Sequence, residues 1–140
     1  MRVGETGRVS RSVVLPSGVT VTGRRMTDIP EVPADFLLAL ADGPLPPWPF
    51  RQINWPDFWI PTDRSDALDG LAEALRRAHA GEAVEVACHG GRGRTGTALA
   101  ALAVLDGLPP ADAVGWVRRV YDPKAVEMPW QAWWVRRLRS

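Results

Sequence analysis

The sequence predicts an α/β fold in which helices flank a small central sheet. Two short runs rich in β-branched residues flank Pro16-Ser17-Gly18, a pattern typical of a β-hairpin near the N-terminus. The apolar residues Val84, Val86 and Ala87 indicate one short buried strand, and an Ala- and Leu-rich segment with the length of a buried helix follows them. Strand patterns in the first half and helix patterns in the second favour a small α/β sandwich, and the length of 140 residues fits a single domain over residues 1–140.

The first half of the chain is punctuated by prolines. Val13–Leu15 and Val19–Val21 are expected to form the hairpin strands. Asp35–Leu40 is expected to be a short helix, and residues 42–49, with four prolines and a glycine, a loop. Ile53 and its neighbours are expected to form a second region of strand.

The second half contains four predicted helices. Asp63 or Ser65 can cap the first, which reaches His79 and has an apolar face of Leu68, Leu71, Ala72 and Leu75. The other three are expected at Thr95–Asp106, at Pro110–Val120, where proline suits a first helical turn, and from about Pro129 to Arg139.

Composition excludes several classes of protein. A chain of 140 residues with a net charge of +1 has no strong general attraction to nucleic acid or to a membrane surface. Its longest apolar run, Ala98–Leu105, is too short to span a bilayer, and the N-terminus lacks the apolar core of a signal peptide. A single Cys cannot form an intramolecular disulfide and keeps best in a reducing compartment, so a cytoplasmic protein is expected. The oligomeric state stays open.

The run Cys88-His89-Gly90-Gly91-Arg92-Gly93-Arg94-Thr95 lies where a strand is expected to give way to a helix. Backbone amides of a Gly-rich loop at a helix N-terminus form a nest for an anion, and the planar guanidinium of Arg94 can grip two of its oxygens. A helix N-terminus beside cations also stabilises a thiolate, which is the nucleophilic form of Cys88. The loop therefore predicts a phosphate cradle with a reactive thiol at its floor.

This arrangement resembles the Cys-x5-Arg loop of the protein tyrosine phosphatase superfamily. The resemblance implies that Cys88 attacks phosphorus and forms a thiophosphoryl intermediate, and that the Thr95 hydroxyl helps the sulfur to leave. It implies further that the phosphate is held by the loop residues His89, Gly90, Gly91, Arg92, Gly93 and Arg94. No metal or other cofactor is required.

A second resemblance lies upstream. Trp55-Pro56-Asp57-Phe58-Trp59-Ile60-Pro61 is similar to the mobile loop that carries the general acid of the family. By this resemblance Asp57 protonates the leaving oxygen and then deprotonates water; Asp63 is the alternative acid, although its position suits helix capping better. A weaker match, residues 125–131, resembles the segment that bears a water-positioning glutamine and indicates Gln131.

Two departures from the family pattern affect the expected substrate. Ala87 replaces the usual His before the nucleophile, so turnover is expected to be modest. His89 and Arg92 resemble the basic loop residues of phosphoinositide-directed members, although Arg92 can instead face solvent or pair with a carboxylate. The chain is short, as in the compact dual-specificity group of the family.

Three function classes follow. The favoured one is a protein tyrosine or dual-specificity phosphatase acting on a phosphorylated protein or small phosphomonoester. A phosphatase for phosphoinositides or inositol phosphates is the second, and a non-catalytic phosphate-binding module is the third. A sulfurtransferase with a similar loop is more distant, because its chemistry does not call for Asp57.

Overall fold

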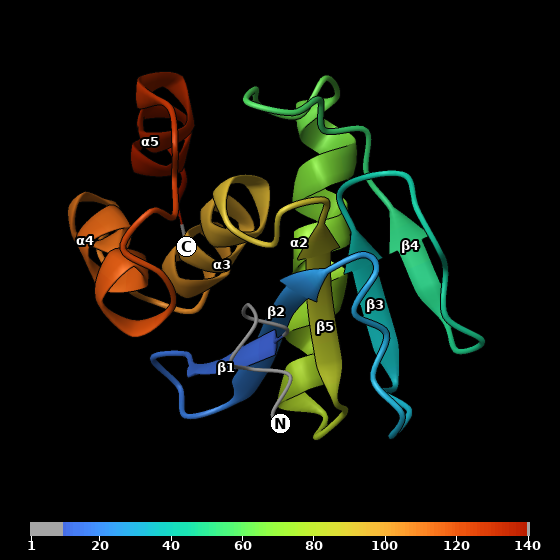
Figure 1. Ribbon diagram of the computed structural model, residues 1–140. Helices are drawn as coiled ribbons and strands as arrows, with labels where there is room; N and C mark the ends of the chain where they lie inside the picture. Colours follow the sequence, from blue (N-terminus) through green and yellow to red (C-terminus); the bar gives the residue numbers. More distant parts are fainter. Residues whose placement is uncertain (1–9, 140) are drawn as a thin grey trace.

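The computed structural model describes residues 10–139, which form a five-stranded sheet covered by helices (Figure 1). The strands are β1 (Ser10–Val14), β2 (Thr20–Arg25), β3 (Phe36–Ala39), β4 (Phe50–Gln52) and β5 (Val84–Cys88). Their order in the sheet is β1-β2-β5-β3-β4, so β5 is the central strand. β1 runs antiparallel to β2, and the remaining neighbours are parallel. The predicted α/β class is confirmed.

The predicted hairpin is confirmed as β1 and β2. Its turn closes where the amide of Leu15 donates to the carbonyl of Val19 and the amide of Gly18 donates to the carbonyl of Leu15. Gly18 has a φ of 99°, in the left-handed region that glycine adopts without steric cost.

The predicted short helix at Asp35–Leu40 is wrong, because this segment forms strand β3 between β4 and β5. All four residues of β3 are buried, since both faces of this part of the sheet are covered. A short run that is apolar throughout has no period that separates a strand from a helix. The strand expected around Ile53 is β4, which ends one residue earlier; the amide of Ile53 still donates to the carbonyl of Ala39.

Four helices follow the strand-rich half, as expected: α2 (Arg64–His79), α3 (Gly93–Leu105), α4 (Pro110–Val120) and α5 (Pro129–Arg136). Asp63 is the N-cap of α2, and its carboxylate accepts a hydrogen bond from the amide of Asp66. α4 has its predicted bounds. α3 begins two residues earlier than expected, and α5 ends three residues earlier.

The core lies between the sheet and these helices. α2 and α3 pack on the sheet, and α4 and α5 pack on α3 (Figure 1). Along β5, the side chains of Val84, Val86 and Cys88 join the helix-facing core, and Ala87 joins a smaller cluster on the opposite face. Alternation along the central strand therefore directs the single thiol toward the helices.

The opposite face of the sheet carries a buried ion pair. The Nε of Arg24 donates to the carboxylate of Glu85 over 2.8 Å, and the guanidinium also donates to the carbonyls of Arg25 and Met26. These contacts compensate the positive charge of the Arg24 guanidinium, which would be costly to bury without a partner. Among residues 10–139, no helix has both the length and the apolar character needed to cross a bilayer.

Candidate active site

The segment between β5 and α3 forms a tight loop at the carboxyl end of the central strand (Figure 1). Cys88 is the last residue of β5 and is only 2% exposed. Its sulfur accepts hydrogen bonds from the amide of Gly91 over 3.2 Å and from the hydroxyl of Thr95 over 3.0 Å. Two donors, one from the loop and one from the first turn of α3, therefore point at this one sulfur.

The loop conformation requires glycine at position 91. Gly91 has a φ of 69°, and a Cβ there would meet the backbone of Arg24 and Arg25 at 3.1 Å. The buried hydroxyl of Tyr121, at the end of α4, donates to the Gly91 carbonyl. The loop is therefore fixed from both sides, by β2 and by the helical layer.

Helix α3 begins within this loop, at Gly93. No side chain of the described residues caps its first turn. The first amides of a helix lack intrahelical partners and carry the positive end of the helix dipole. This end of α3 is therefore suited to an anion that lies over Cys88.

Arg94 lies in the first turn of α3 and is only 4% exposed. Its Nη1 donates to the carbonyl of Trp55 over 2.8 Å and to that of Leu40 over 3.2 Å. Its Nε has no hydrogen-bond partner within residues 10–139 and lies 3.4 Å from a carboxylate oxygen of Asp57. The guanidinium is thus held through its Nη1, and its Nε, which pairs with Asp57 without a hydrogen bond, is placed to bind an incoming oxyanion.

Asp57 lies in the loop between β4 and α2, with its side chain 54% exposed. It lines a cavity of about 140 Å³ at the phosphate loop together with Phe58, Cys88, Gly90, Arg92, Gly93, Arg94 and Glu127. The next residue, Phe58, has a φ of 61°, which is rare for an aromatic side chain and costs conformational energy. The predicted acid and the predicted nucleophile therefore share one cavity.

Helix α5 holds this acid-bearing loop in place. The indole of Trp130 donates to the Phe58 carbonyl over 2.6 Å, and the amide of Gln131 donates to the Trp59 carbonyl over 3.0 Å. The indole of Trp55 donates to the same Trp59 carbonyl over 2.7 Å. Three side chains thus fix two consecutive carbonyls next to Asp57.

Gln131 is fully buried and does not line the cavity at the phosphate loop. While its amide nitrogen binds Trp59, its oxygen accepts from the backbone amide of Met128 at the N-cap of α5. The side chain therefore joins the start of α5 to the acid-bearing loop. Its predicted role in positioning water is untested and stays a prediction.

Glu127 is the residue of this cavity that the sequence analysis missed. Its carboxylate lies against Gly93, where any Cβ would overlap with it. The preceding Val126 has a φ of 61°, a strained value for a β-branched residue. Arg118 clamps this segment by donating to the carbonyl of Ala125 over 2.9 Å and to that of Val126 over 2.6 Å. This strained backbone conformation places a second carboxylate in the cavity that contains Cys88.

The remaining residues singled out by the sequence lie as follows. The side chain of Arg92 is 47% exposed, and its Nε donates to Asp122 over 3.2 Å. Pairing with a carboxylate was one of the alternatives expected for Arg92. The Nε2 of His89 donates to the carbonyl of Asp42 over 2.7 Å. Asp63, the alternative acid, caps α2 and does not line the cavity.

Within residues 10–139, no group of three or more His, Cys, Asp or Glu side chains is arranged to hold a metal ion. The charges that line the phosphate-loop cavity are those of two arginines, Arg92 and Arg94, and two carboxylates, Asp57 and Glu127.

Comparison with known proteins gives two results. No protein-family model matches the chain, and no curated protein matches it. Solved structures do match. The structure of Tk-PTP in its active form is 27% identical, with a TM-score of 0.63, and the match covers 73% of this chain and 75% of that one.

Two further structures are similar in fold. Human DUSP28 is 19% identical with a TM-score of 0.65, and 89% of this chain and 88% of that chain are covered. PTPMT1 in complex with PI(5)P is 14% identical with a TM-score of 0.65, and the match covers 83% of this chain and 87% of that chain. The central strand, the loop that follows it and the helical layer therefore form a fold of the protein tyrosine phosphatase superfamily, of the dual-specificity-like type.

Proposed function

We propose that the protein hydrolyses phosphate monoesters through a thiophosphoryl intermediate on Cys88, and that its substrates are phosphorylated proteins. One observation carries the proposal: the buried Cys88 sulfur accepts two hydrogen bonds and shares a cavity with Arg94 and Asp57. Phosphatases among the structures of similar fold support the same reaction.

In the first step the thiolate of Cys88 attacks phosphorus. The S–P bond forms as the P–O bond to the leaving group breaks, and Asp57 gives its proton to the leaving oxygen. The Arg94 Nε and the free amides of α3 face the charge that builds up on the phosphoryl oxygens.

In the second step water attacks the phosphorus of the intermediate. Asp57, now a carboxylate, takes the proton from that water, the S–P bond breaks, and the sulfur leaves as a thiolate that Thr95 stabilises by hydrogen bonding. Gln131 and Glu127 are the two candidates to orient the water. Glu127 lines the cavity in the geometry observed, whereas reorganisation of the acid-bearing loop would have to release Gln131.

A phosphoinositide or inositol phosphate substrate is the second candidate, and the similar fold of PTPMT1 in complex with PI(5)P favours it. Its support from the loop residues is weak, because Arg92 pairs with Asp122 and His89 binds the Asp42 carbonyl. We therefore rank a phosphoprotein substrate first. A lone reactive thiol keeps best in a reducing compartment, so we expect the protein to act in the cytoplasm.

The decisive experiment replaces the nucleophile. Cys88→Ser should abolish turnover of an aryl phosphate while vanadate still binds, because Arg94 and the loop amides remain. A Ser variant that kept more than a small fraction of the activity would contradict the mechanism. Wild-type protein that binds vanadate but turns over neither aryl phosphate nor phosphopeptides would instead be a non-catalytic phosphate-binding module.

A further inference from the structure

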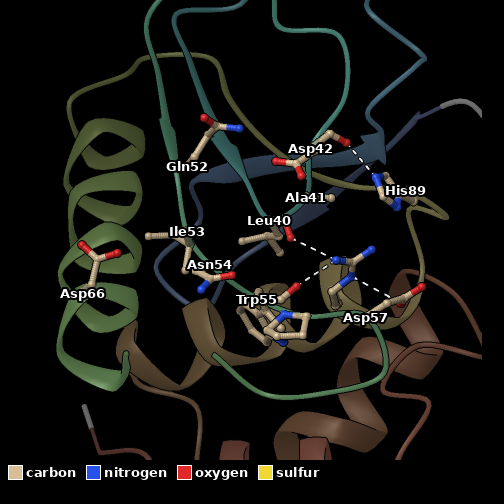
Figure 2. Close-up of a pocket in the computed structure, with 12 residues that line it drawn as sticks. Leu40, Ala41, Asp42, Gln52, Ile53, Asn54, Trp55, Asp57, Asp66 and His89 are labelled. Atoms are coloured by element: carbon tan, nitrogen blue, oxygen red, sulfur yellow. Dashed lines mark hydrogen bonds and ion pairs between the residues drawn. The ribbon is translucent and has the colours of Figure 1, made fainter. Parts of the chain in front are cut away.

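A second and larger cavity lies directly beside the proposed phosphate site. It measures about 540 Å³, within the range of small-ligand pockets, and lies between the end of β3, the segment that follows β4 and the start of α2 (Figure 2). Arg94 and Asp57 line both this cavity and the smaller one that contains Cys88. A substrate whose phosphate lies over Cys88 therefore has its neighbouring groups at the opening of the larger cavity.

The walls of this cavity combine apolar surface with unpaired polar groups. Leu40, Ile53 and Trp55 supply the apolar part. The amide side chains of Gln52 and Asn54 make no hydrogen bond to any residue from 10 to 139, so their carbonyl oxygens are free to accept one from a ligand.

The charge of the cavity is negative. Its basic side chains already contact protein groups: the Nη1 of Arg94 donates to two backbone carbonyls, its Nε lies 3.4 Å from Asp57, and the Nε2 of His89 donates to the carbonyl of Asp42. The Asp42 carboxylate, in contrast, has neither an ion-pair nor a hydrogen-bond partner in the described part of the chain. Figure 2 shows it directed toward the interior of the cavity, across from Gln52.

Asp66, which also lines the cavity, provides a contrast. Its carboxylate accepts from Arg51 over 2.7 Å, and Figure 2 shows it on α2, at the far edge of the cavity. Among the described residues that line the cavity, Asp42 is therefore the one whose carboxylate has no partner in the protein. The Arg94 Nε, which lies 3.4 Å from Asp57, also has no hydrogen-bond partner among residues 10–139, and it can bind the phosphate end of a ligand that spans both cavities.

We propose that this cavity, which we name the Asp42 pocket, binds a Lys or Arg side chain that lies near the phosphorylated residue of a protein substrate. The methylene groups of such a side chain fit the apolar wall, and its charged head meets the Asp42 carboxylate. An unpaired carboxylate repels a second phosphate, so the same pocket disfavours inositol polyphosphates. This inference rests on the proposed phosphatase function and specifies its substrate.

The test compares phosphotyrosine peptides that differ at one position. Lys, Ala or Glu is placed in turn at each of the three positions on either side of the phosphotyrosine, and kcat/KM is measured. At one position or more, we expect Lys to raise kcat/KM about tenfold over Ala and Glu to lower it. Equal values for the three residues at every position, or faster turnover of inositol polyphosphates than of any peptide, would overturn the inference.

Variants of the pocket identify the residue responsible. Asp42→Asn should reduce the Lys-to-Ala ratio of kcat/KM to about one, and Asp42→Lys should reverse it so that the Glu peptide is preferred. Asp66→Asn is the matched control and should keep the ratio. A ratio lost in Asp66→Asn and kept in Asp42→Asn would contradict the assignment. A small aryl phosphate separates the two proposals, because turnover of it without any peptide preference rejects the Asp42 pocket and leaves the phosphatase function in place.

Discussion

The Thr95 hydroxyl donates a hydrogen bond to the Cys88 sulfur over 3.0 Å, from the first turn of the helix that follows the phosphate loop. A hydrogen bond of this kind is stronger to a free thiolate than to a sulfur bonded to phosphorus. In the proposed reaction it therefore favours departure of the sulfur.

Thr95→Val should slow the second chemical step more than the first. We expect kcat to fall about 10- to 100-fold, the rate factor that corresponds to the loss of one hydrogen bond to a charged group. Because the intermediate then accumulates, a pre-steady-state burst of the aryl alcohol should appear. Thr97→Val is the matched control, since the Thr97 hydroxyl donates to the Gly93 carbonyl and not to the sulfur. A wild-type kcat without a burst in Thr95→Val would contradict this role.

Arg94→Lys should reduce both phosphate affinity and kcat/KM, the latter by at least about tenfold. A lysine keeps the charge, but it cannot bind the carbonyls of Leu40 and Trp55 and present a free Nε at the same time. Arg92→Lys, on the same loop, serves as the control and should have a small effect. Near-wild-type kinetics for Arg94→Lys would show that charge alone is sufficient.

Asp57→Asn should slow formation of the intermediate by about 10² to 10⁴ with an alkyl or tyrosyl phosphate, whose leaving group needs a proton. An activated aryl phosphate should suffer much less in that step. The basic limb of the kcat/KM profile against pH should flatten in Asp57→Asn and persist in Asp63→Asn. The reverse pattern would assign the acid to Asp63.

Gln131 and Glu127 can be distinguished by the step that each affects. Glu127→Gln keeps the shape of the side chain but removes the carboxylate from the cavity, and we expect it to slow hydrolysis of the intermediate and to produce a burst. Gln131→Met breaks the bond to the Trp59 carbonyl. If Gln131 acts only as an anchor of the acid-bearing loop, this variant slows the first step with a tyrosyl phosphate; a burst in Gln131→Met would instead support the predicted role in positioning water.

Asp106, which lies outside the candidate active site, makes the free energy of unfolding depend on pH. Burial raises the pKa of its carboxyl, but hydrogen bonds from Ser17 and His79 lower it more, so the net pKa lies below its ordinary value. The side chain is 3% exposed and ties the β1–β2 turn to the helical layer. A carboxyl with a depressed folded-state pKa stabilises the protein above its unfolded value, about 3.9, and loses that effect as the pH falls through the folded value.

Asp106→Asn should therefore lower the free energy of unfolding at pH 7 by about 1 to 2 kcal/mol, and the difference from wild type should shrink below about pH 4. Urea unfolding at several pH values measures it. Glu31→Gln, an exposed side chain, is the control. A difference that grows as the pH falls would refute the sign of this linkage.

Local patterns predicted much of this fold. The hairpin, the cap at Asp63 and the bounds of α4 each depend on residues close together in the sequence, so turn and helix rules are sufficient. β3 was not predicted correctly, because its state is decided by pairing with β5, which lies far along the chain. The sequence of four consecutive apolar residues does not indicate whether they will pair with a distant strand.

The candidate site divides in the same way. Cys88, Arg94 and Thr95 lie in one continuous motif, and the structure brings Asp57 to the same cavity as the first two. Glu127 was missed because its position depends on a left-handed Val126 that Arg118 clamps, and side-chain type alone does not indicate either feature. The assignment of a single domain to residues 1–140 stays a prediction.

The contacts between α5 and the acid-bearing loop have a practical consequence. The rings of Trp59 and Trp130 lie 5.4 Å apart, and the Trp130 indole also binds the Phe58 carbonyl. A displacement of Asp57 with its loop away from α5 would separate these two indoles and break that hydrogen bond. The chain therefore contains an intrinsic optical reporter: the coupled circular dichroism and fluorescence of this tryptophan pair would follow the proton donor through a turnover without an attached dye.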